Sequence, residues 1–150
     1  MINKKKVLAI ASAGGHWTQL KMIEPAFSHH SVHYVTTHLN RSVQNTPNLS
    51  RVIDADMSMK LKLPVLAIQV ACLLIWHRPE IVISTGAAPG FFAVMFGKLI
   101  GAKTLWIDSM ANFSELSMSG RQAQRFCDLC LTQWPDLADG KQVKHFGNLL

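Results

Sequence analysis

Two glycines and a histidine follow the first apolar run of the chain, at a point where a strand would give way to a helix. Residues 7–11 are apolar, and Ser12, Gly14, Gly15 and His16 come after them. Glycine lets the backbone approach a ligand closely, and the free N–H groups at a helix N-terminus attract anions. An imidazole can exchange a proton near neutral pH. The loop therefore predicts an anion site beside a proton-transfer group, and the alternative is a tight turn in which the histidine packs locally.

A second loop of similar design follows a later apolar run. Residues 81–83 lead into Ser84, Thr85 and Gly86, and Pro89 is expected to open the next helix. Proline suits the first helical turn because its missing N–H would have no partner there. In an open parallel sheet, the loops after the carboxyl ends of the strands line one crevice, so we expect both loops to face the same ligand. Neither loop has the glycine spacing of a dinucleotide-binding or P-loop motif.

A carboxylate and an amide follow a third apolar run. Asp108 ends the run at 103–108, and Asn112 lies in the loop after it. A carboxylate at this place suits binding of a substrate hydroxyl or general-base catalysis, and the alternative is that it caps the following turn. The candidate bases are therefore His16 and Asp108, with His16 preferred. The predicted substrate-binding residues are Ser12, Gly14, Gly15, Thr85, Gly86 and Asn112.

The elements that must position these loops alternate between strand and helix. Strands are predicted near residues 6–11, 31–37, 51–54, 80–84, 103–108, 129–133 and 143–146. Helices are predicted near residues 15–27, 60–77, 89–100 and 117–126. This alternation predicts an α/β fold, Rossmann-like, with a mostly parallel sheet and helices on both faces. At 150 residues the whole chain, 1–150, is expected to form a single domain.

The composition indicates which partners to expect. Hydrophobic residues make up 49% and charged residues only 16%, which predicts surface that a partner or a membrane covers. The excess of 15 Lys and Arg over 9 Asp and Glu gives a net charge of +6, which suits anionic lipid or a phosphorylated substrate. The basic residues are scattered, so no nucleic-acid partner is expected. The 3 cysteines include one C-x-x-C pair, too few ligands for a zinc site, so we expect reduced cytoplasmic thiols and no metal.

Two of the predicted helices carry more apolar side chains than a sheet can cover. Between Leu63 and Trp76, Gln69 is the only strongly polar side chain, and the helix near 89–100 has a similar excess. The first run is shorter than the roughly 20 residues that a membrane span needs. Contact with a membrane or partner is expected, and the alternative is core packing. The predicted surface comprises Lys60, Lys62, Trp76, Arg78, Phe91, Phe92, Phe96, Lys98, Gln133 and Trp134.

Taken in order, the loop motifs resemble those of a known family. The set comprises residues 12–16, 84–90, 108–112 and 116–120, Asp128, residues 133–135 and residues 145–148. It is similar to the membrane-associated subunit of two-component oligosaccharide-biosynthesis glycosyltransferases. That group includes bacterial proteins of the PssD and EpsE type and the anchor subunit of the eukaryotic dolichol-pathway N-acetylglucosamine transferase. The resemblance runs over essentially the whole chain.

The resemblance implies that this chain is the N-terminal, acceptor-side half of a split GT-B glycosyltransferase similar to MurG. A second polypeptide would bind the UDP-sugar, no other cofactor is implied, and this chain alone is expected to be inactive. The implied reaction transfers a hexosyl group, N-acetylglucosamine or glucuronic acid, to a polyprenyl-diphosphate-linked acceptor at the cytoplasmic face of the membrane. Two other interpretations stay open: a non-catalytic scaffold that recruits the catalytic subunit, and a self-contained α/β nucleotide-binding enzyme.

The motifs carry over to this sequence with two departures. The family's Gly-Gly-His corresponds to residues 14–16, and its Ser/Thr-Gly pair corresponds to residues 85–86. The third motif usually reads Glu-Ser-x-Ala-Arg, whereas here Asp108 stands for the glutamate and Asn112 for the arginine. A role that needs the longer acid or a guanidinium is therefore not expected. Eukaryotic anchor subunits also have an N-terminal membrane helix, whereas here residues 4–6, all lysine, lead directly into the first strand, so we expect peripheral membrane contact.

Overall fold

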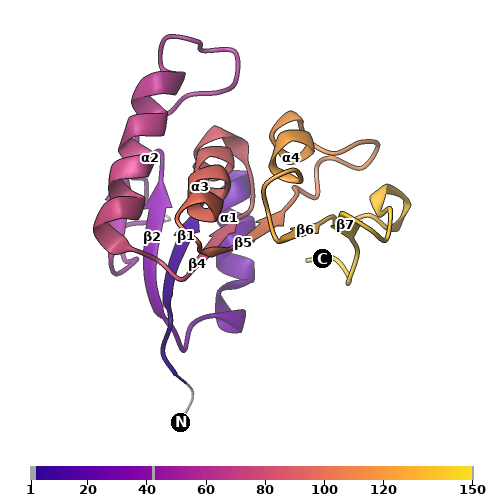
Figure 1. Ribbon diagram of the computed structural model, residues 1–150, viewed down its shortest axis with the longest axis horizontal. Helices are drawn as coiled ribbons and strands as arrows, with labels where there is room; N and C mark the ends of the chain where they lie inside the picture. The colour runs from indigo at the N-terminus through magenta and orange to yellow at the C-terminus, as the bar shows by residue number, and fades with distance from the viewer. Residues whose placement is uncertain (1–2, 42, 150) are drawn as a thin grey trace.

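A single parallel sheet organises the protein (Figure 1). The computed structural model describes residues 3–41 and 43–149. The sheet is 7-stranded, in the order β3-β2-β1-β4-β5-β6-β7, and every strand pair is parallel. The strands are β1 (Lys6–Ile10), β2 (Ser31–Thr36), β3 (Leu49–Arg51), β4 (Ile81–Ser84), β5 (Lys103–Ile107), β6 (Leu129–Leu131) and β7 (Val143–Lys144). The predicted α/β class and parallel sheet are therefore confirmed.

Helices cover both faces of this sheet. They are α1 (Gly15–Met22), α2 (Leu63–His77), α3 (Ala87–Leu99) and α4 (Met118–Ala123), with short 3₁₀ turns η1 (Glu24–Ala26) and η2 (Pro135–Leu137). Figure 1 shows α2, α3 and α4 on one side of the strands and α1 on the other. Each side has its own apolar core, one formed with α2, α3 and α4 and the other with α1.

Strand β1 shows why the sheet needs helices on both faces. Leu8 and Ile10 point into the core with α2 and α3, whereas Val7 and Ala9 point into the core with α1 and its Trp17. None of the four β1 side chains is more than 2% exposed. A strand that is buried on both faces needs apolar residues at successive positions, and this accounts for the continuous apolar run in the sequence.

Helix α3 lies directly against the sheet because two of its positions have no side chain. A Cβ atom at Gly90 would lie 1.9 Å from Ser84 Oγ, and one at Gly97 would lie 2.8 Å from Val82 Cγ2. This contact holds the N-terminus of α3 at the carboxyl end of β4, where the second loop lies.

Most elements differ from their predicted bounds by a few residues, and in β3 and α1 the structure shows the physical reason. Strand β3 is Leu49–Arg51, not 51–54, because the Ile53 N–H leaves the sheet and donates to Gln69 Oε1 of α2 at 2.8 Å. Helix α1 ends at Met22, short of the predicted 27, and Pro25 lies in η1 after it. Proline disfavours helical backbone at the residue before it and offers no N–H to the preceding turn.

Helix α2 is apolar on both of its faces. Its inner residues Leu66, Val70 and Leu74 are at most 1% exposed. Its outer face is formed by Val65, Ile68, Cys72, Ile75 and Trp76, all exposed. Trp76 is 84% exposed, so the predicted apolar excess of this helix does lie on the surface. In the part of the chain that the structure describes, no helix combines the length and apolar character needed to cross a membrane.

The predicted surface of α3 needs correction. Phe91, Phe92 and Phe96 are half-buried and pack against the core that α3 shares with α2, so they form no exposed patch. The exposed apolar residues lie at the end of this helix, where Leu99 is 77% exposed. Lys98 is exposed but forms an ion pair with Asp128. Lys60, Lys62 and Arg78 are exposed near the two ends of α2.

Candidate functional site

A crevice of about 520 Å³ opens at the carboxyl edge of the sheet, where the loops after several strands meet. We term it the carboxyl-edge crevice. Its walls include Ser12 and His16 after β1, residues 54–58 after β3, Ala87 and Ala88 after β4, and Ser109 and Asn112 after β5. The structure thus brings together residues from all three loops that the sequence singled out.

His16 is fixed by a reciprocal pair of hydrogen bonds to the second loop. Its Nδ1 lies 2.9 Å from the carbonyl oxygen of Thr85, and Thr85 Oγ1 donates to the His16 carbonyl oxygen at 2.6 Å. A carbonyl oxygen only accepts, so the hydrogen bond assigns the proton of the neutral ring to Nδ1. Nε2 then carries a lone pair that can accept a proton. His16 is half-buried and lines the crevice, as a general base requires.

Thr85 and Gly86 lie behind His16 and position it. Both are buried, and neither is among the residues that line the crevice. A Cβ atom at Gly86 would lie 2.3 Å from His16 Nδ1, so only glycine leaves room for the ring. The structure therefore places these two predicted substrate-binding residues one layer behind the cavity.

The backbone is strained where α3 begins. Gly86 has φ 140°, and the next residue, Ala87, has φ 67°, a left-handed conformation that is uncommon for a residue with a side chain. Helix α3 starts at Ala87 instead of 89, so Pro89 occupies the third helical position, still in the turn whose N–H groups lack helical partners. Strain of this kind gathers at functional sites, and an alanine gives no sequence signal for it.

The first loop leaves the start of α1 open. Gly14 precedes the helix with φ 85°, and no described side chain caps the helix there. Gly14 and Gly15 are exposed, and a Cβ atom at either would meet nothing within 4 Å. Backbone at this position is therefore accessible to a ligand at the N-terminal, electropositive end of α1.

Asp108 is buried and anchors the third loop. It is 1% exposed and accepts hydrogen bonds from Trp106 Nε1 at 3.1 Å, the Ser117 N–H at 2.8 Å and Ser117 Oγ at 2.5 Å. Ser117 in turn caps α4, because its Oγ accepts from the Gly120 N–H at 2.8 Å. Asp108 does not line the crevice. The geometry therefore favours the capping alternative over general-base catalysis.

Two buried glutamines brace the same loop from inside. Gln19 of α1 donates from Nε2 to Ser109 Oγ at 3.2 Å and accepts at Oε1 from the Met110 N–H at 3.3 Å. Gln133 Nε2 donates to Gln19 Oε1 at 2.8 Å and to the Asp108 carbonyl oxygen at 3.1 Å. Gln133 is only 3% exposed, so the prediction that it belongs to a surface is wrong. Its amide stays inside because this network satisfies it.

Trp134 supports the loop from its other side. The residue is half-buried, and its Nε1 donates to the Met110 carbonyl oxygen at 2.9 Å. Its ring makes an edge contact with Phe113, with centroids 6.5 Å apart. Trp134 therefore packs against the third loop, which was the alternative to a sugar or partner contact.

Three further residues of this site are not among the residues predicted from the sequence. Gln19 is buried on α1, as are its neighbours Trp17 and Leu20. The signal in the sequence was a polar residue close to these two large apolar ones. Asp54 and Asp56 follow β3 and line the crevice, so the rule that identified the other loops would have found them. Hydrogen bonds from Ser58 hold the pKa of Asp56 below its ordinary value, so this carboxylate is charged at neutral pH and available to substrate hydroxyls.

Carboxylates and imidazoles in the site do not gather into a metal centre. Among residues 3–41 and 43–149, no group of three or more His, Cys, Asp or Glu side chains is placed to hold a metal ion.

Comparison with known proteins gives a family match across most of the chain. Residues 18–149 match the family described as oligosaccharide biosynthesis protein Alg14 like. The UDP-N-acetylglucosamine transferase subunit ALG14 of Yarrowia lipolytica is 33% identical over 69 residues, which cover 42% of this chain and 32% of that protein. The corresponding subunit of Schizosaccharomyces pombe is 34% identical over 75 residues, covering 46% and 36%. The matched segments thus span about a third of these relatives.

Solved structures share the fold at low sequence identity. MurG of Acinetobacter baumannii superposes with a TM-score of 0.79 and 12% identity over 94% of this chain and 45% of that chain. The UDP-N-acetylglucosamine 2-epimerase of Rickettsia bellii gives a TM-score of 0.73 and 14% identity over 98% and 46%. The chain therefore has the Rossmann-like fold of one half of a GT-B protein, as predicted.

Proposed function

The chain belongs to the Alg14-like family of oligosaccharide biosynthesis proteins, and from this membership we propose that it is the acceptor-side subunit of a UDP-sugar glycosyltransferase. The acceptor is a polyprenyl-diphosphate-linked molecule, and a separate subunit binds the donor. UDP-N-acetylglucosamine is the first donor to test, because both curated relatives are named as subunits of a transferase for that sugar. UDP-glucuronic acid is the second.

One observation carries this proposal: His16, with an available Nε2, lines the crevice in the first turn of α1, and the glycine-rich start of that helix is exposed directly before it, although neither glycine lines the crevice itself. The acceptor diphosphate would lie against the exposed backbone of residues 14–15 and the first turn of α1. The attacking hydroxyl would lie beside His16. Its oxygen forms the bond to the anomeric carbon as the bond to UDP breaks. UDP leaves with that electron pair, and the hydroxyl proton passes to His16 Nε2.

The crevice supports the acceptor assignment through its polar rim. Asp54 and Asp56 offer carboxylate oxygens to sugar hydroxyls, while Ser12 and Asn112 add further hydrogen-bonding groups. Aspartates would repel a diphosphate at their own position, so the diphosphate belongs on the helix side of the crevice and the sugar on the aspartate side.

The proposed location is the cytoplasmic face of a membrane, with the outer face of α2 in contact with lipid. Its exposed Ile68, Ile75 and Trp76 supply apolar area. Lys60 and Lys62 near one end of α2 and Arg78 at the other are exposed and suit anionic headgroups.

The test is a transfer assay with the purified chain alone and in complex with its donor-binding subunit. With UDP-N-acetylglucosamine and a polyprenyl-diphosphate-linked acceptor, we expect turnover only in the complex. His16→Ala should lower the rate by roughly 10²–10⁴-fold. His29→Ala, which alters an exposed histidine outside the crevice, should not.

Each alternative has its own outcome in this assay. Turnover by the chain alone would support a self-contained enzyme and contradict the split one. Full activity of the His16→Ala complex, with membrane recruitment lost when the chain is omitted, would support a scaffold.

A further inference from the structure

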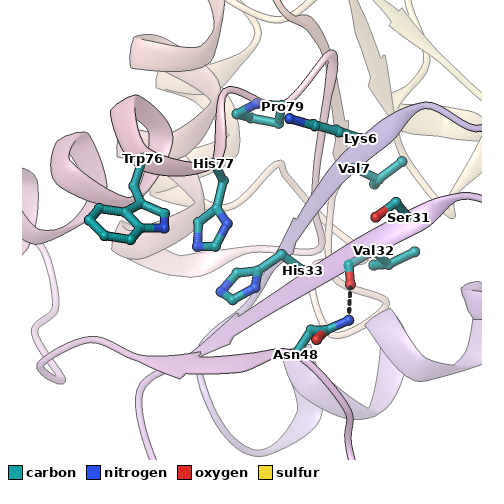
Figure 2. A pocket seen from close by; sticks show the side chains of 9 residues that line it. All are labelled: Lys6, Val7, Ser31, Val32, His33, Asn48, Trp76, His77 and Pro79. Atoms are coloured by element: carbon teal, nitrogen blue, oxygen red, sulfur yellow. Dashed lines mark hydrogen bonds between the residues drawn. The ribbon is translucent and has the colours of Figure 1, made fainter.

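A second cavity lies at the opposite, amino edge of the sheet (Figure 2). Its volume is about 310 Å³, and we term it the amino-edge pocket. Lys6 at the start of β1, His33 of β2, Asn48 before β3, and Trp76 and His77 at the end of α2 contribute to its lining. It shares no lining residue with the carboxyl-edge crevice, and the proposed transfer reaction does not use it.

Every ionisable side chain among the described residues that line this pocket is basic. Lys6, His33 and His77 come from three different elements and face the same space (Figure 2). The charged residues that follow α2 are Arg78 and Glu80. Glu80 is exposed and outside the lining, although its Oε1 accepts from the Lys6 backbone N–H at 3.2 Å. A pocket with basic side chains and no carboxylate in its walls is complementary to an anion.

The two imidazoles are stacked, with ring centroids 3.7 Å apart and planes at 26°. His33 Nε2 also lies 2.8 Å from Ser50 Oγ, which holds this ring in place. Partial burial, and then the neighbouring His77, lower the pKa of His33 to about 4. Burial, and then Lys6, lower the pKa of His77. Three basic groups therefore crowd one cavity whose described lining residues include no carboxylate, and an anion placed among them would favour the charged form of both rings.

From this geometry we propose that the amino-edge pocket binds a phosphate-class anion through Lys6, His33 and His77, with proton uptake by the imidazoles on binding. Trp76 stands on the rim and is 84% exposed, and the outer face of α2 leads to it. The phosphodiester of a lipid headgroup and free phosphate share this chemistry. The position of the pocket at the end of an exposed apolar helix face favours the headgroup as its source.

The first experiment uses the full chain and inorganic phosphate, followed by histidine side-chain NMR and calorimetry. We expect the His33 and His77 resonances to shift on titration and their pKa values to rise. The affinity for phosphate should be about tenfold or more higher at pH 6 than at pH 8, because binding takes up protons and each pKa unit corresponds to a factor of ten. Lys6→Gln and His77→Gln should each weaken binding by about tenfold, whereas His29→Gln should not.

The second experiment distinguishes the two sources. Vesicles of phosphatidylcholine with phosphatidic acid are compared with phosphatidylcholine alone. Competition by inorganic phosphate, and weaker vesicle binding by His77→Gln, would identify the headgroup. Phosphate binding that leaves vesicle binding unaffected would identify the free anion.

Unchanged His33 and His77 resonances in saturating phosphate, or equal phosphate affinity of the Gln variants and the unaltered chain, would overturn the proposal. Circular dichroism of each variant separates a lost site from a lost fold. None of these measurements depends on glycosyl transfer, so the result is independent of the proposed function.

Discussion

At the scale of single residues, the position of His16 depends on an atom that Gly86 lacks. The imidazole fills the space where a Cβ atom would lie 2.3 Å from its Nδ1. We expect Gly86→Ala to displace the ring and abolish most transfer. It should also lower the free energy of unfolding by about 1–3 kcal/mol, because φ is 140° at this position. Urea denaturation and the transfer assay measure the two effects.

The neighbouring Gly15 supplies a matched control for stability. A Cβ atom there would meet nothing within 4 Å, and the residue is the first of α1. Gly15→Ala should therefore leave stability unchanged or raise it by less than about 1 kcal/mol. If Gly86→Ala were as stable as Gly15→Ala and fully active, the close packing of His16 on Gly86 would have no functional role.

Asp108 offers a second test at this scale, because its carboxylate accepts three hydrogen bonds that an amide side chain could not all accept. Asp108→Asn replaces one accepting oxygen by an NH₂ group that faces Trp106 Nε1 or the Ser117 donors. An unpaired buried donor costs about 1–3 kcal/mol, so the variant should unfold at lower urea concentration. Transfer should fall because the third loop loosens. Unaltered stability with abolished transfer would instead identify Asp108 as the base.

At the scale of elements, the apolar pattern predicted those whose burial follows from their own residues, and the predictions were wrong where a hydrogen bond to a side chain of another element decides the structure. The apolar pattern alone located β1 and α2, because their burial follows from their own residues. The end of β3 depends on Gln69, which takes the Ile53 N–H out of the sheet. The burial of Gln133 depends on Gln19, more than a hundred residues earlier in the chain. Hydrogen bonds between distant residues leave no periodic signal in a sequence.

The stacked histidines His33 of β2 and His77 of α2 predict that the stability of the protein depends on pH. His33 has a pKa of about 4 in the folded protein, whereas an unfolded chain protonates near the ordinary value of 6.5. Between these values the unfolded state takes up a proton that the folded state does not, so stability present above pH 6.5 is lost as the pH falls toward 4. His33 is partly exposed, so solvent screening reduces the expected loss to the order of 1 kcal/mol.

Urea denaturation in phosphate-free buffers at pH 7 and pH 4.5 checks this expectation. The variant His33→Asn should lose less stability over the same interval, since it removes the group that titrates. An equal loss in both proteins would mean that other residues cause the acid sensitivity.

At the scale of the whole molecule, the surface has one apolar helix face without a partner among the described residues. We expect Ile68→Glu to weaken binding to anionic vesicles by about tenfold or more, because burying an isoleucine contributes about 1.5–3 kcal/mol. Ile68 is 63% exposed, so the change should leave the fold intact. Phe146→Glu, at a side chain that is 75% exposed but distant from α2 in the sequence, is the control in vesicle co-sedimentation. Equal binding by both variants would indicate that α2 contacts a protein.

The strand order also has a consequence for synthesis on the ribosome. Strand β1 is an interior strand and pairs on one side with β2 and on the other with β4, where Val7 lies opposite Ile81. Its second edge therefore stays unpaired while α2, the most apolar helix, emerges before β4. Parallel pairings that join distant segments form slowly, and unpaired apolar edges favour aggregation. Nascent chains that stop before β4 should bind chaperones strongly, and release should follow once β4 is available to complete the centre of the sheet.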